Sequence, residues 1–134
     1  MNKKSINDNI GIAYDALREC KIAEGNKINK TFRGQISTFG AAVTMGSLLP
    51  AIAFFSDDGG SSVKRTKLLN AIYYVIKKSK NENVSANNLN VTDLFKYVRS
   101  CKENEDQCKE DVLNAAIALK LAMNMYELIE ADAS

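Results

Sequence analysis

The sequence predicts an all-α fold, in which residues 1–134 form one single-domain bundle of about six helices. Its composition favours helix, because alanine, leucine, isoleucine, lysine and glutamate are abundant and proline occurs once. Apolar residues recur three or four positions apart along most of the chain, and no segment sustains the period of two that marks a strand. A chain of 134 residues suits one domain with its own core. We therefore expect helices joined by short polar loops and no sheet.

The N-terminal third predicts two amphipathic helices. The first is expected over residues 6–24, with Gly25 as its C-terminal cap. The second is expected to begin at Asn26 or Asn29. Their apolar faces comprise Ile6, Ile10, Ala13, Tyr14, Leu17 and Cys20 in the first helix, and Ile28, Phe32, Ile36, Phe39 and Val43 in the second.

The most apolar stretch of the chain is GSLLPAIAFF, residues 46–55. Gly46 is expected to end one helix and Ser47 to cap the next, whose first turn tolerates Pro50. A membrane-spanning helix needs about 20 apolar residues, and the uninterrupted run here is much shorter. The stretch therefore predicts a short buried helix and no membrane segment.

The rest of the chain predicts three more helices separated by polar loops. After a turn at residues 56–62, the helices are expected over 63–80, from Thr92 or Asp93 through a short segment, and over 106–131. The stripe of the last helix comprises Cys108, Val112, Ala115, Leu119, Ala122, Tyr126 and Ile129. Of the tyrosine pair in the 63–80 helix, Tyr73 is expected in the core, and Tyr74 is expected closer to solvent.

The sequence lacks the residues that most catalytic and metal sites need. It contains no histidine, which excludes imidazole bases, Ser-His-Asp triads and most zinc sites. It shows no phosphate loop and no dinucleotide fingerprint. Carboxylates cluster around residues 103–111, where they could bind a divalent ion, but a helix N-terminus also favours negative charge. We expect no metal, no cofactor and no enzymatic activity.

Three cysteines and an N-terminus without a long apolar run predict a cytoplasmic protein with reduced thiols. Cys101 and Cys108 lie seven residues apart, and we interpret them as packing residues in preference to a redox couple.

The positive charge is concentrated in one half of the chain. The net charge is only +2, but residues 1–67 hold ten Lys and Arg against six Asp and Glu, whereas residues 68–134 hold eight against ten. Two basic groups stand out: one spans residues 18–33, and the other is the acid-free span 64–80. Binding to a phosphate backbone requires only positive charge along a surface, so these groups predict contact with nucleic acid. A surface that merely faces solvent would show the same pattern of charges. The candidate RNA-binding residues are Lys21, Lys30, Arg33, Lys64, Arg65 and Lys67.

The order of local patterns resembles a known family. These patterns are Ala13-Tyr14, Phe32-Arg33, GSLLPAIAFF at 46–55, LLNAIYYVIKK at 68–78 and VLNAAIALKLAMNMYELIEA at 112–131. In this order they resemble the small subunit of the CRISPR-associated Cmr effector complex (type III-B), and the resemblance covers nearly the whole chain.

The resemblance implies a non-catalytic helical subunit of an antiviral, RNA-guided complex. Copies of the chain would stack along a filament with other Cmr subunits and help to hold the guide and target RNA. Two alternatives remain open. One is a helical regulatory protein that docks a partner helix in a groove near Phe54 and Phe55. The other is the small subunit of a related CRISPR effector type.

Overall fold

The computed structural model of the protein describes residues 2–130 and confirms the mostly helical prediction. Within that range the chain forms six α-helices, two short 3-10 helices and three very short strands. In chain order they are α1 (Lys3–Glu19), β1 (Ala23–Glu24), β2 (Lys27–Asn29), α2 (Lys30–Met45), α3 (Leu48–Phe55), α4 (Thr66–Ser79), η1 (Ala86–Asn88), α5 (Asp93–Arg99), α6 (Glu105–Ala122), η2 (Met123–Met125) and β3 (Glu127–Ile129).

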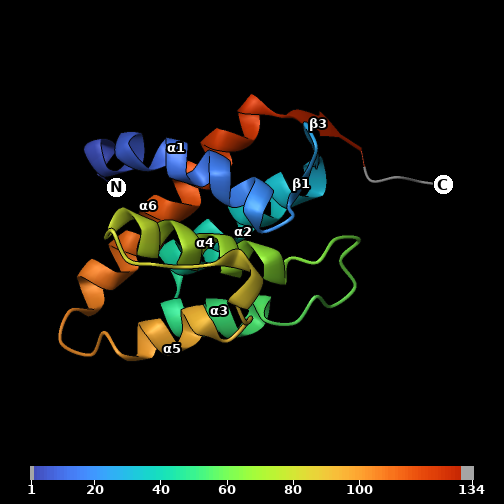
Figure 1. Cartoon of the computed structure of the whole chain (residues 1–134). Coiled ribbons are helices and arrows are strands. Elements are labelled where there is room, and N and C mark those ends of the chain that lie inside the picture. The colour runs from blue at the N-terminus through green and yellow to red at the C-terminus, as the bar shows by residue number, and fades with distance from the viewer. Residues whose placement is uncertain (1, 131–134) are drawn as a thin grey trace.

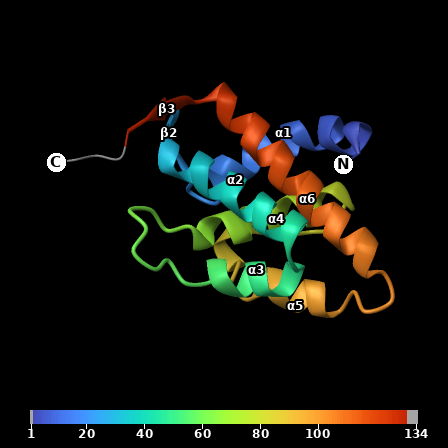
Figure 2. The same cartoon turned by 180° about the vertical axis from the view of Figure 1, so that it is seen from behind.

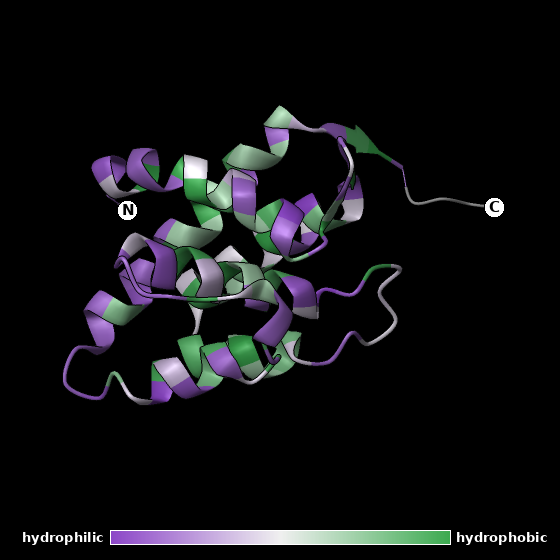
Figure 3. Ribbon diagram, in the orientation of Figure 1, coloured by the Kyte–Doolittle hydropathy of each residue, from purple (hydrophilic) through white to green (hydrophobic). Residues whose placement is uncertain are grey.

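Helix α4 lies in the middle of the bundle. Figure 1 shows α1 and α6 on one side of it and α3 and α5 on the other, and Figure 2 shows α2 crossing α6 on the opposite face. The buried residues of α4 are Leu68, Leu69, Ala71, Ile72, Tyr74, Val75 and Ile76. Figure 3 shows hydrophobic and hydrophilic residues alternating along the helices, as expected when helices bury their apolar faces against one another.

The apolar run of residues 48–55 forms helix α3, as predicted. Phe55 is 1% exposed, and its ring packs edge-on against Phe39 of α2 with the centroids 5.3 Å apart. Gly46 ends α2, and Pro50 lies in the first turn of α3, where its missing N–H removes no intrahelical bond. The prediction that this helix is buried is wrong for one of its faces: only Ala51, Ile52 and Phe55 are buried, and Phe54 is 65% exposed.

A three-stranded sheet contradicts the expectation that the chain has no strands. Strand β1 pairs antiparallel with β2, and β2 pairs parallel with β3, so the order is β1-β2-β3. The second helix therefore begins at Lys30 with Asn29 as its N-cap, and Ile28 lies in the sheet instead of the helix. Strands of two or three residues are too short to display a period of two, so periodicity could not reveal them.

Helix α1 ends earlier than predicted and is not capped by glycine. Its last residue is Glu19, and Lys21 adopts the left-handed conformation with φ 61°. The N–H groups of Lys21 and Ile22 donate to the carbonyl oxygens of Arg18 and Leu17, respectively. This is a Schellman arrangement with lysine at the position that glycine usually holds. Gly25, with φ 61°, lies in the β1–β2 turn instead.

The last helix also ends earlier than predicted. Helix α6 stops at Ala122, and the chain continues through η2 into β3. Tyr126 and Ile129 therefore do not extend the helical stripe. The side chain of Tyr126 is buried between the helices: its ring stacks on Tyr14 of α1 at 4.8 Å, and its hydroxyl donates to the Tyr14 carbonyl oxygen at 2.9 Å.

The tyrosine pair of α4 is arranged in the opposite way to the prediction. Tyr74 is buried, whereas Tyr73 is half-buried and packs edge-on against Tyr97 of α5. Because the apolar face of α4 is wide, two adjacent residues both fall within it, and the neighbouring helices decide which one is covered.

Two glycines in different conformations give a matched test of these local structures. Gly11 lies inside α1 and a methyl group there would meet no atom within 4 Å, so Gly11→Ala should stabilise the protein by about 0.5–1 kcal/mol. Gly25→Ala should destabilise it by about 1 kcal/mol, because alanine is strained at positive φ. Urea unfolding of both variants measures these changes, and a shift of the same sign in both would contradict the assignment of the turn.

Candidate nucleic-acid interface

Four lysines converge on one pocket at the end of the molecule that carries the sheet. The pocket has a volume of about 370 Å³, and apolar side chains such as Ile22 and Phe32 line it together with charged ones. The four lysines are Lys21, Lys27, Lys64 and Lys67. We call this the lysine pocket.

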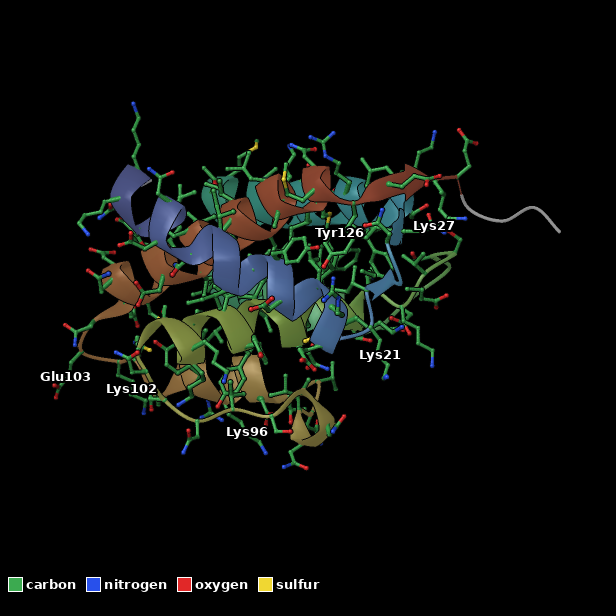
Figure 4. The ribbon with its side chains drawn as sticks, turned by 45° about the horizontal axis from the view of Figure 1, so that its top comes forward. Lys21, Lys27, Lys96, Lys102, Glu103 and Tyr126 are labelled. Carbon is green, nitrogen blue, oxygen red and sulfur yellow. The ribbon has the colours of Figure 1, made fainter. Side chains whose placement is uncertain are left out.

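Each lysine reaches the pocket through a different piece of local structure. Lys21 is carried there by the left-handed turn that ends α1, and Lys27 by the β1–β2 hairpin (Figure 4). Lys64 and Lys67 lie at the start of α4, and the Lys67 ammonium donates to the Lys21 carbonyl oxygen at 3.0 Å. That bond fixes the start of α4 against the end of α1. The pocket is therefore assembled from segments more than 40 positions apart in the chain.

Two glutamates moderate the charge of the lysine pocket. Glu24 and Glu130 both line it, which leaves a net charge of +2 on the six charged residues. Glu130 also accepts a hydrogen bond from Lys30, and this bond together with the charge of Lys30 lowers the pKa of the Glu130 carboxyl. Lys30 is therefore ion-paired at the edge of the pocket.

Both predicted arginines, Arg33 and Arg65, lie outside the pocket lining. Arg65 donates to the carbonyl oxygens of Asp57 and Phe54, and its guanidinium lies over the rings of Phe54 and Phe55, 4.7 and 4.8 Å from their centroids. These contacts fasten the loop after α3 onto that helix. Arg33 is half-buried on α2 and is not among the residues that line the pocket.

The structure therefore brings together three of the six predicted residues, Lys21, Lys64 and Lys67, and places Lys30 at the edge of the pocket. Lys27 belongs to the basic group of residues 18–33 but was not among the candidates, since only the unpredicted hairpin carries it to the others. Glu130 reaches the pocket because it follows strand β3. The sequence did not reveal this strand, since the apolar stripe of the last segment predicted a helix there.

The basic span of residues 64–80 is divided by the length of α4. Lys77 and Lys80 lie at the other end of this 14-residue helix, about 20 Å away. There Lys80 donates to the Tyr97 hydroxyl at 2.7 Å, and Lys77 pairs with Glu82 at 3.3 Å. These lysines join α4 to its neighbours and do not contribute to the lysine pocket.

Two findings bear on metal binding and on thiol chemistry. Residues 2–130 contain no group of three or more Cys, Asp and Glu side chains that could hold a metal ion. Burial raises the pKa of both the Cys20 and Cys108 thiols to about 12, and a hydrogen bond with Cys101 contributes at Cys108. Thiols of this kind are poor nucleophiles at neutral pH. The first turn of α6 contains Glu105 and Asp106, where the helix dipole favours negative charge.

Comparisons with family models, with curated proteins and with solved structures found no match to this chain. In the part of the chain that the structure describes, no helix has both the length and the hydropathy required to cross a membrane.

Substitutions at Lys21 can separate the charge of the pocket from the stability of the protein. Lys21→Gly should raise the free energy of unfolding by about 1 kcal/mol, because glycine adopts the left-handed conformation without strain, while it removes one ammonium group from the pocket. Lys21→Ala, the matched control, removes the same charge but keeps the strain. Urea unfolding tests this expectation, and equal stability of the two variants would contradict it.

Proposed function

We propose that this chain is a non-catalytic, RNA-binding small subunit of an RNA-guided CRISPR type III-B (Cmr) effector complex in the cytoplasm. Its lysine pocket would contact the phosphate backbone of the guide or target RNA, and copies of the chain would stack beside other subunits of the complex. The observation that carries RNA binding is the convergence of four lysines on one pocket. The resemblance described above supports the assignment to the complex.

The chemistry of the pocket suits a phosphate group. Lysine ammonium groups bind phosphate oxygens as compact charges and do not require a fixed approach angle. The apolar side chains of Ile22 and Phe32, which also line the pocket, would exclude water from the part of a bound phosphate that they contact. Because contacts between lysine ammonium groups and phosphate oxygens carry no information about the bases, this binding would be independent of sequence.

Glu130 would act as a competitor for the phosphate. It pairs with Lys30 in the free protein, and a phosphate oxygen that replaced it would gain a fifth cation at the pocket. Isolated chains would then bind RNA weakly, and several stacked copies would bind it tightly through multivalency.

Salt dependence tests the electrostatic mechanism directly. In fluorescence anisotropy with a labelled 30-nucleotide RNA, Lys21→Gln, Lys64→Gln and Lys67→Gln combined should reduce the slope of log affinity against log salt by about 0.7–0.9 for each lysine that binds a phosphate. The control combines Lys96→Gln and Lys102→Gln, two exposed lysines away from the pocket (Figure 4). It should leave the slope almost unchanged. An equal reduction of the slope in both variants would contradict the mechanism, because the pocket lysines would then attract RNA only as other exposed lysines do.

The assignment to a Cmr complex has its own test. The tagged chain, purified from its native host at low salt, should bring with it the other subunits of a type III-B complex and short guide RNA, identified by mass spectrometry and RNA sequencing. Recovery of a different CRISPR effector, or of partners without RNA, would contradict the assignment.

A further inference from the structure

The aromatic ring of Phe54, near the end of α3, lies at the surface. Phe54 is 65% exposed, and it is the only aromatic residue among residues 2–130 whose side chain is exposed. The next residue, Phe55, is buried, and the two rings meet edge to face with their centroids 5.8 Å apart. The burial of Phe55 therefore anchors the end of α3 and leaves the Phe54 ring beside the core, in contact with solvent.

Arg65 holds the Phe54 ring and the backbone around it in place. Its Nη2 atom donates to the Phe54 carbonyl oxygen at 2.9 Å, and its Nε atom donates to the Asp57 carbonyl oxygen at 2.7 Å. Its guanidinium lies 4.7 Å from the centroid of the Phe54 ring, where a cation attracts the ring. Since Phe54 is 65% exposed with this guanidinium in place, the rest of the ring surface faces solvent. The ring is therefore preorganised for a ligand that stacks on it.

The Phe54 ring lies near the lysine pocket. Arg65, which contacts the ring, directly follows Lys64, which lines the pocket. The loop that contains both, residues 56–65, projects from the end of the molecule that carries the sheet (Figure 1, Figure 2). Adjacent Cα atoms are about 3.8 Å apart, so the ring and the pocket are separated by little more than the lengths of two side chains. A short polymer reaches both.

The charges beside the ring differ from those of the pocket. Asp57 and Asp58 follow α3 closely, and their carboxylates accept hydrogen bonds from the N–H groups of Gly59 and Thr66. These carboxylates would repel a phosphate at the ring, whereas the lysines attract one at the pocket. The ring therefore suits an uncharged planar group that is attached to a chain of phosphates. A nucleobase of RNA has this chemistry, because every base has a face that stacks on aromatic side chains.

We infer that Phe54 stacks on a nucleobase of single-stranded RNA, next to a phosphate that is bound in the lysine pocket. The base contacts the ring surface that Arg65 leaves uncovered. Bases inside a duplex already stack on one another and present no free face, so this site selects a single strand. The inference rests on the RNA binding proposed above and adds the class of RNA that the surface takes.

The test compares two labelled 12-nucleotide oligomers that carry the same phosphates. One has adenine at every position, and the other has abasic residues throughout. Fluorescence anisotropy at low salt should show that the adenine oligomer binds at least about tenfold more tightly. Phe54→Ala should remove most of this preference and leave the salt slope unchanged, because it removes a stacking surface but no cation. When a uridine oligomer pairs with the adenines, Phe54→Ala should have no effect on binding.

Three further variants separate stacking from other effects. Phe54→Trp keeps an aromatic face and should preserve the preference for the adenine oligomer, whereas Phe54→Leu keeps only apolar character and should lose most of it. Met45→Ala is the matched control, since Met45 is 87% exposed, apolar and outside the lining of the lysine pocket. It should bind both oligomers like the unmodified protein. Circular dichroism and urea unfolding establish that the variants are folded.

Several outcomes would overturn the inference. These are equal binding of the two oligomers, an equal loss with both oligomers in Phe54→Ala, or a preference that survives in Phe54→Leu. If Phe54→Ala lost a co-purifying protein but kept its affinity for the adenine oligomer, the ring would belong to a protein interface instead.

The same data separate this inference from the proposed function. If the lysine-pocket variants reduce the salt slope and Phe54→Ala changes nothing, only the stacking inference fails. If the unmodified protein binds neither oligomer, RNA binding and stacking fail together.

Discussion

The burial of Tyr126 against α1 is the interaction on which the proposed interface depends. Its ring stacks on Tyr14, and its hydroxyl donates to the backbone of the same residue, so both the apolar and the polar part of the side chain are satisfied. This contact turns the chain out of η2 in an extended conformation and directs β3 towards β2. The position of Glu130 beside the lysines follows from that course of the chain.

The end of the chain then completes a structure begun near its start. The Glu127 N–H donates to the Asn26 carbonyl oxygen at 2.8 Å, which joins the hairpin to the C-terminal segment. The hairpin carries Lys27, and the Lys67 ammonium holds α4 to the end of α1. Lysines from separate elements are thus brought together at one pocket.

The four longer helices, α1, α2, α4 and α6, could be predicted from the sequence because each repeats its apolar pattern over several turns. Helix α3 could be predicted from the length of its apolar run and from the adjacent Gly46 and Pro50, but its burial was overestimated, because Phe54 is exposed. The strands could not, since two or three residues show no period. Tyr126 is instructive: it keeps the spacing of the α6 stripe and is buried as that spacing predicts, but in an extended segment after the helix.

The candidate site was predictable in part. Charge density along the chain singled out Lys21, Lys64 and Lys67 as candidates. The structure places all three at one pocket. Charge density could not separate them from Arg65, one position after Lys64, because the loop after α3 turns that guanidinium onto Phe54. Both residues precede α4, so no helical period relates them, and their tertiary contacts decide which one lines the pocket.

The most direct measurement of the central claim is hydrogen exchange at the Glu127 amide. If Tyr126 holds β3 against β2, this amide should exchange far more slowly than in an unstructured peptide. In Tyr126→Ala it should exchange at nearly the peptide rate, while amides in the middle of α6, such as that of Leu119, stay protected. Protection of Glu127 that survived removal of the Tyr126 side chain would contradict the account.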